Sequence, residues 1–180
     1  MILMPGMLMI GAAGRKAGKT QFACGLIKKF SSQHRIIGIK VTSIDSQNKG
    51  CHRGATDCNV CSRMEGAYEI CEETDRQNAK DTGRMLASGA DRVFWLRCKK
   101  THLEQGMAAV LEIIGNDAIS ICESNSLRAV VEPGVFIMVT GNSDIGWKEY
   151  AKKVAHYADR VVYFDGKQFN FSDDMIHLRE

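Results

Sequence analysis

A Gly-Lys-Thr triplet near the N-terminus offers the chemistry of phosphate binding. Residues 13–20 read Ala-Gly-Arg-Lys-Ala-Gly-Lys-Thr, which matches the P-loop pattern G-x-x-x-x-G-K-[ST] except that alanine replaces its first glycine. In a P-loop, consecutive backbone N–H groups and the start of the following helix surround the phosphate oxygens. The lysine contacts the β- and γ-phosphates, and the hydroxyl of the last residue binds Mg²⁺. The predicted nucleotide-contacting residues are Ala13, Gly14, Arg15, Lys16, Ala17, Gly18, Lys19, Thr20 and Gln21.

The residues on either side of this motif favour a nucleotide-binding loop over the alternative interpretation. That alternative is a glycine-rich turn between a strand and a helix that binds no ligand. Residues 7–11 are apolar and residues 19–30 alternate as an amphipathic helix does, which is the context that a P-loop requires. We therefore predict Mg-nucleotide binding here.

Two carboxylates are candidates to complete a Mg²⁺ site with Thr20. Glu123 directly follows the apolar residues 118–122, and Asp45 comes shortly after a second predicted strand. Ligands of parallel sheets bind at the edge where the strands have their carboxyl ends, so both residues are expected near the P-loop. The alternative interpretation is that each is a solvated loop residue without a role in metal binding. The sequence supports this alternative more for Asp45 than for Glu123. Lys19 and Glu123 are the predicted catalytic pair.

A group of cysteines forms a second candidate site. Cys58 and Cys61 make a C-x-x-C pair, Cys51 precedes them, and the fourth ligand would be Cys71 or His52. Thiolates at this spacing hold zinc or an iron–sulfur cluster. The alternatives are a redox dithiol and ordinary free cysteines.

Taken in order, these motifs resemble the MobB family, the P-loop proteins of molybdopterin guanine dinucleotide synthesis. The resemblance rests on the P-loop, on Gly-Ile-Lys-Val-Thr at 38–42, and on Lys-Asp-Thr-Gly-Arg-Met-Leu-Ala-Ser-Gly-Ala at 80–90. Glu123 falls where that family has the glutamate at the end of a strand. The resemblance implies a homodimeric, GTP-binding protein of the MinD-like P-loop class.

The resemblance also implies a role for Lys80, Asp81 and Arg84 in recognising an anion such as a nucleotide phosphate. On residue types alone, these three residues indicate only a solvent-exposed first turn of a helix, where the acidic Asp81 interacts favourably with the helix dipole. We expect a slow NTPase that prefers GTP to ATP, uses Mg²⁺ and acts in molybdenum or other metal-cofactor maturation. Its partner would be a molybdenum-cofactor protein or a metalloenzyme. The alternatives are a small-molecule kinase and a non-catalytic switch that responds to nucleotide and to metal or redox state.

Short apolar runs alternate with helix-length amphipathic ones along the chain. This order predicts an α/β fold, a P-loop NTPase domain with a mainly parallel sheet and helices on both faces. The predicted strands are residues 7–11, 36–41, 92–97, 118–122, 135–139 and 160–164, and the predicted helices are 19–30, 78–88, 101–114 and about 147–157.

Length and composition set the limits of these interpretations. With 180 residues, of which 44% are hydrophobic and 25% charged, the chain predicts a single globular domain over 1–180. A polar insertion at about 44–72 carries four of the cysteines. The formal charge of 24 − 21 = +3 is too small to predict a nucleic acid or membrane partner. No signal-peptide pattern opens the sequence, so we expect a cytoplasmic protein.

Overall fold

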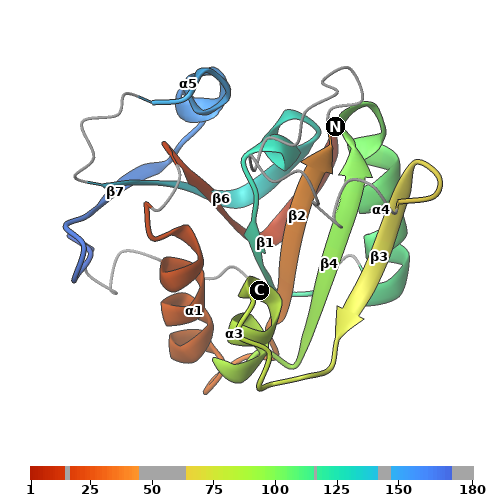
Figure 1. Ribbon diagram of the computed structural model, residues 1–180, viewed down its shortest axis with the longest axis horizontal. Coiled ribbons are helices and arrows are strands. Elements are labelled where there is room, and N and C mark those ends of the chain that lie inside the picture. Colours follow the sequence, from red (N-terminus) through yellow and green to blue (C-terminus); the bar gives the residue numbers. More distant parts are fainter. Residues whose placement is uncertain (15–16, 45–63, 116, 142–146, 172–180) are drawn as a thin grey trace.

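The chain forms a seven-stranded sheet with helices packed against it (Figure 1). The computed structural model describes residues 1–14, 17–44, 64–115, 117–141 and 147–171. The strands are β1 (Ile2–Ala12), β2 (Ile37–Ile44), β3 (Tyr68–Glu73), β4 (Arg92–Lys99), β5 (Ser120–Glu123), β6 (Val131–Gly141) and β7 (Arg160–Phe164). The helices are α1 (Lys19–Phe30), α3 (Asp81–Ala87), α4 (Leu103–Ile114) and α5 (Glu149–Ala155), with short 3₁₀ turns η1 (Lys100–His102) and η2 (Ser126–Ala129).

The strand order is β3-β4-β2-β5-β1-β6-β7, and all neighbouring pairs are parallel except β3 with β4. The predicted α/β class with a mainly parallel sheet is thus confirmed. Within the described residues, none of the helices combines the length and the apolar character needed to cross a bilayer.

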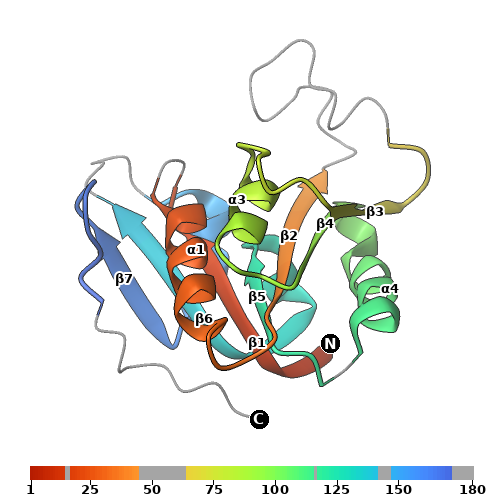
Figure 2. The same ribbon diagram turned by 90° about the horizontal axis from the view of Figure 1, so that it is seen from below.

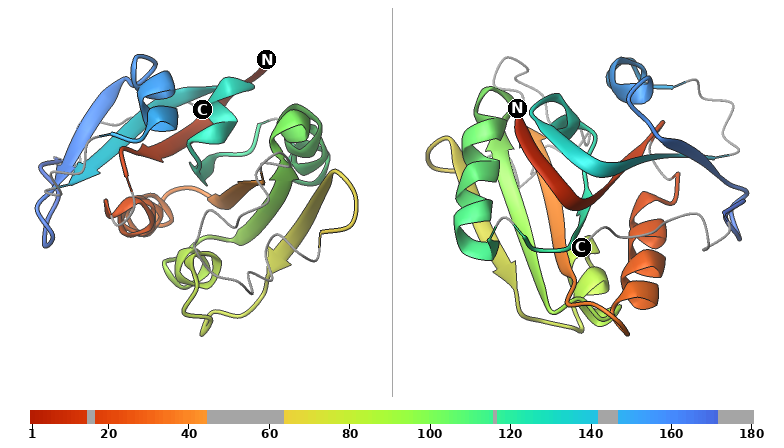
Figure 3. Two further views of the ribbon diagram at one scale, coloured as in Figure 1. Left: turned by 45° about the horizontal axis from the view of Figure 1, so that its top comes forward. Right: turned by 180° about the vertical axis from the view of Figure 1, so that it is seen from behind.

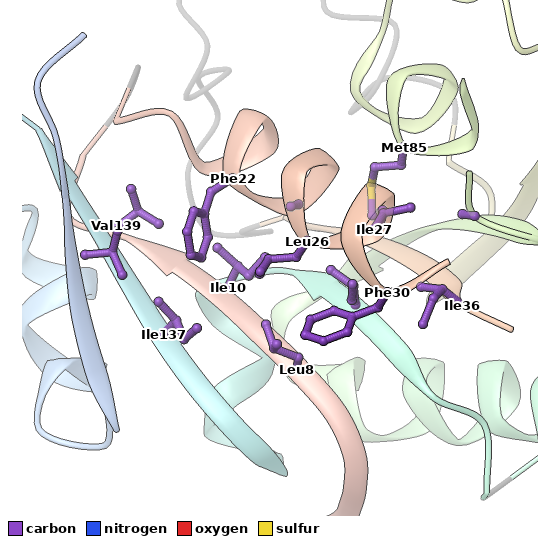
Figure 4. Close-up of a cluster of buried hydrophobic side chains, with 14 of the residues drawn as sticks. Leu8, Ile10, Phe22, Leu26, Ile27, Phe30, Ile36, Met85, Ile137 and Val139 are labelled. Atoms are coloured by element: carbon purple, nitrogen blue, oxygen red, sulfur yellow. The ribbon is translucent and has the colours of Figure 1, made fainter. Parts of the chain in front are cut away.

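Helices cover both faces of the sheet. Successive side chains of a strand point to opposite sides, so each strand contributes apolar side chains to both faces. Leu8 and Ile10 of β1 belong to the buried cluster that α1 and α3 complete, shown in Figure 4. Met7 and Met9 belong to a second cluster, which α4 and α5 complete. Figure 2 shows α1 and α3 on one side of the central strands and α4 on the other, and α4 lies in front when the molecule is seen from behind in Figure 3. The same elements are labelled in Figure 1.

The helix α1 follows its prediction because its sequence is strongly amphipathic. Its apolar positions recur at helical spacing, and Phe22, Leu26, Ile27 and Phe30 are all buried against the sheet. Burying side chains of this size contributes about 1.5–3 kcal/mol each. This packing fixes the first turn of α1, and hence the triplet Gly18-Lys19-Thr20, against the end of β1.

Two elements differ from the sequence-based expectations. The range predicted as an insertion ends in β3, a half-buried edge strand whose residues Tyr-Glu-Ile-Cys-Glu-Glu carry too many charges to stand out as a strand. The helix predicted over 78–88 begins only at Asp81, because Lys80 has an extended backbone with φ −72° and ψ 168°. β3 forms by antiparallel pairing with β4, and before α3 the Lys80 N–H donates to Asn78 Oδ1 at 3.1 Å.

Candidate functional site

The loop between β1 and α1 is held in a conformation that requires glycine. Gly18 caps α1 with φ 82°, in the left-handed region, and its carbonyl oxygen accepts the first helical hydrogen bond from the Phe22 N–H at 2.8 Å. A Cβ at Gly18 would also come within 2.9 Å of the Phe164 ring. Arg15 and Lys16 lie outside the described residues.

Gly18→Ala is therefore expected to destabilise the fold by about 1–2 kcal/mol, the cost of a left-handed residue with a side chain. Displacement of Phe164 adds to this cost. The matched control is Gly14→Ala in the same loop, because no described atom lies within 4 Å of a Cβ built there and its φ is not positive. Urea unfolding curves measure both variants. Equal midpoints for the two would contradict the assigned role of Gly18.

The carboxylate of Glu123 is the centre of the site. Its side chain is 2% exposed, and its Oε2 accepts a hydrogen bond from the Thr20 hydroxyl at 2.8 Å. Its Oε1 accepts a hydrogen bond from the Lys40 ammonium at 2.5 Å and lies 3.6 Å from Nζ of Lys19. The two residues predicted to share a metal, Thr20 and Glu123, are thus in direct contact. A hydroxyl and a carboxylate are oxygen ligands suited to Mg²⁺.

Lys40 links this carboxylate to a second one. It lies next to Glu123 in the parallel pairing of β2 with β5, and its ammonium also donates to Asp81 Oδ2 at 2.7 Å. Burial raises the pKa of Asp81, but the Lys40 ammonium, the Thr20 hydroxyl and Arg84 together outweigh burial, and the pKa lies below its ordinary value. Sequence reasoning did not assign Lys40 to the site. The available signal was a lysine inside an otherwise apolar strand.

Asn125 fixes the end of β1 beside Glu123. Its side-chain oxygen accepts from the Ala12 N–H at 2.8 Å, and its amide nitrogen donates to the Ala12 carbonyl at 2.8 Å. The next residue, Ala13, donates to Val139 and accepts from the Lys148 N–H. The start of the loop is therefore tied to three segments that are distant in sequence. The sequence analysis predicted neither Asn125 nor Lys148 as a residue of the site.

These residues surround a cavity of about 570 Å³ at the carboxyl edge of the central strands. It is lined by Ala12, Gly14, Ala17, Gly18, Lys19, Thr20, Gln21, Lys40, Asp81, Arg84, Glu123, Asn125, Lys148 and Phe164. This volume is within the range of about 300–1,000 Å³ typical of small-molecule sites. Four cationic side chains face two carboxylates, so the cavity favours an anionic ligand.

Lys19 has an unusual proton affinity in this cavity. Its side chain is 25% exposed. Burial lowers the pKa of the ammonium below its ordinary value, and the Glu123 carboxylate offsets only part of this effect. An anion beside Lys19 would stabilise the charged form and raise this pKa again.

The other predicted residues divide between those placed and those outside the described chain. Asp81 and Arg84 line this cavity, whereas Lys80 lines a neighbouring one. Asp45, Cys51, His52, Cys58 and Cys61 all lie outside the described residues, so the predicted cysteine metal site stays a prediction. Cys71 is in β3, where its thiol donates to Glu69 Oε1 at 3.4 Å. In the part of the chain that the structure describes, no three His, Cys, Asp or Glu side chains are arranged to hold a metal ion.

Comparison of this chain with protein-family models, with curated proteins and with solved structures finds no significant match.

Proposed function

We propose that this chain is a P-loop protein that binds a Mg-nucleoside triphosphate and hydrolyses it slowly. The observation that supports this most is the contact of Thr20 with Glu123 beside Lys19, at the start of α1 and at the edge of β5. A backbone loop, a helix N-terminus, a lysine and a hydroxyl–carboxylate pair in one cavity are the parts that bind triphosphate and metal.

The role of each residue follows from its position. The Lys19 ammonium neutralises the terminal phosphates, and the N–H groups at the start of α1 donate to their oxygens. Thr20 Oγ1 now donates a hydrogen bond to Glu123 Oε2 at 2.8 Å, and these two oxygens would turn to the metal. Mg²⁺ would neutralise charge that develops on the phosphates.

Slow turnover is expected because the carboxylates of the cavity are already paired. Both Glu123 and Asp81 accept hydrogen bonds from the Lys40 ammonium. A carboxylate that is held by a cation is a poor acceptor for a proton from water. Among the described residues lining the cavity there is no further carboxylate to activate water.

The preference for GTP, the homodimer and the role in molybdenum or other metal-cofactor maturation are part of this proposal, and they rest on the resemblance to the MobB family. Calorimetric titration with Mg-GTP and Mg-ATP tests binding, and phosphate release tests hydrolysis. We expect saturable binding with GTP the tighter ligand. Absence of binding by both nucleotides would refute the proposal. Phosphate release that requires an added acceptor would instead favour the small-molecule kinase.

The lowered pKa of Lys19 predicts that nucleotide binding takes up a proton. Phosphate favours the ammonium form, so the pKa of Lys19 is higher in the complex than in the free protein. Between these two pKa values, affinity falls as the pH rises, because binding must then protonate the lysine. Calorimetry at a series of pH values from neutral to alkaline, in buffers of different ionisation enthalpy, measures the proton uptake. Lys19→Ala should lose it, and equal uptake by this variant would assign the proton to another group.

A further inference from the structure

A second, smaller cavity adjoins the one described above. It has a volume of about 260 Å³ and is lined by Lys40, Thr42, Lys80, Asp81, Thr82 and Trp95. Lys40 and Asp81 line both cavities, so their ion pair forms the boundary between them. Whatever occupies the second cavity therefore lies next to the ligand of the first.

This cavity lies on the sheet beside the start of α3. Lys40 and Trp95 are neighbours in the parallel pairing of β2 with β4, and α3 begins only at Asp81. The seven-residue helix α3 packs on the sheet through Met85 and Leu86, and Trp95 is partly exposed.

Trp95 offers the cavity an aromatic surface, and the guanidinium of Arg97 lies over one face of its ring, 5.0 Å from the ring centroid. Its indole N–H donates to the Thr42 hydroxyl at 2.9 Å, so the ring is fixed in place and its polar group is already satisfied. Thr82 is similarly committed, since its hydroxyl donates to Glu73 at 2.7 Å. A planar ring that stacks on the indole would gain contact without displacing either hydrogen bond.

The charges of the cavity favour an anion. Lys40 is held by Glu123 and Asp81, but Lys80 is exposed, and no described residue pairs with its ammonium. Lys80 precedes α3 with an extended backbone, which directs it to this cavity and away from the cavity that Arg84 lines. Because two carboxylates already compensate Lys40, Lys80 is the cation of this cavity that would pair with an anion.

We propose that this second cavity binds the non-nucleotide substrate of the protein, a small planar aromatic or heteroaromatic acid whose ring stacks on Trp95 and whose carboxylate or phosphate pairs with Lys80. The proposal rests on the proposed function in one respect, because nucleotide binding in the adjoining cavity is what makes the second ligand a substrate. The volume fits one or two rings, below the size of sites for drug-like ligands.

The experiment follows the indole N–H signal of Trp95 by two-dimensional ¹H–¹⁵N NMR, with Trp147→Phe to assign the two indole signals. The probes are benzoate and phenyl phosphate. Benzamide lacks the charge of benzoate, and cyclohexanecarboxylate lacks its aromatic ring. We expect saturable shifts with the two aromatic acids, and affinity at least several-fold weaker for both reference compounds. Lys80→Ala should weaken benzoate binding several-fold, whereas the exposed Lys153→Ala on α5 should not.

Lys19→Ala separates the two cavities in the same experiment. If the shifts persist in this variant, the aromatic acids bind at Trp95 and not at the P-loop, whether or not the protein binds nucleotide. The proposal is overturned if neither acid gives a saturable shift in protein that still gives a folded spectrum. It is equally overturned if Lys80→Ala binds benzoate as the unaltered protein does.

Discussion

Lys19→Ala is expected to weaken Mg-nucleotide binding by roughly 10- to 150-fold. A hydrogen bond to a charged group contributes about 1.5–3 kcal/mol, and each 1.4 kcal/mol is a factor of about ten in affinity. Lys19 is the cationic side chain at the start of α1 and shares the cavity with Thr20. Isothermal titration calorimetry with Mg-GTP and Mg-ATP gives the affinities directly.

The fold should survive this substitution, because Lys19 is not the only cation at Glu123. The carboxylate keeps its hydrogen bonds from Lys40 and from Thr20 when Lys19 is removed. A matched control is Lys28→Ala, which removes an exposed lysine from the last turn of the same helix. Unchanged affinity in Lys19→Ala, with a normal unfolding midpoint, would show that the ammonium takes no part in binding the nucleotide.

The sequence predicted the parts of the site that are local. The loop residues and the start of α1 at Lys19 follow one another in the chain, and the periodicity of residues 19–30 is strong. Glu123 was predicted because strand ends of parallel sheets meet at one edge. The pairing of Ile10 with Glu123 places this carboxylate beside β1, in contact with Thr20.

The parts that sequence reasoning missed depend on pairing between distant strands. Lys40 is a site residue because β2 pairs with β5, and this register puts it beside Glu123. Its contact with Asp81 further requires that α3 begins there and no earlier. Asn125 lies in the loop after β5, and it joins Ala12 through two hydrogen bonds. No local spacing encodes these contacts, which arise only once the strand order is known.

The pairing of β5 with β1 and β2 gives Glu123 two proposed roles, to bind the metal and to hold Lys40 and Thr20 in place. The substitution Glu123→Gln separates these two roles. A glutamine can still accept from Lys40 with its oxygen, while its amide group donates to the Thr20 hydroxyl, so the site keeps its shape. What is lost is the negative charge that a metal requires. We expect Mg²⁺-dependent phosphate release to fall by roughly 10- to 100-fold, the size of effect seen when groups that support a bound metal are removed.

Nucleotide binding without Mg²⁺ should change much less, because in the proposed complex Lys19 and backbone N–H groups hold the triphosphate. Removing the negative charge of Glu123 would also lessen repulsion between like charges in the proposed complex with the triphosphate. Affinity measured with Mg²⁺ and with EDTA, together with phosphate release, therefore distinguishes a metal ligand from a residue that only stabilises the fold. The control is Glu132→Gln, at an exposed position of β6. An equal loss with and without Mg²⁺ would mean that Glu123 serves chiefly to hold Lys19, Lys40 and Thr20 in place.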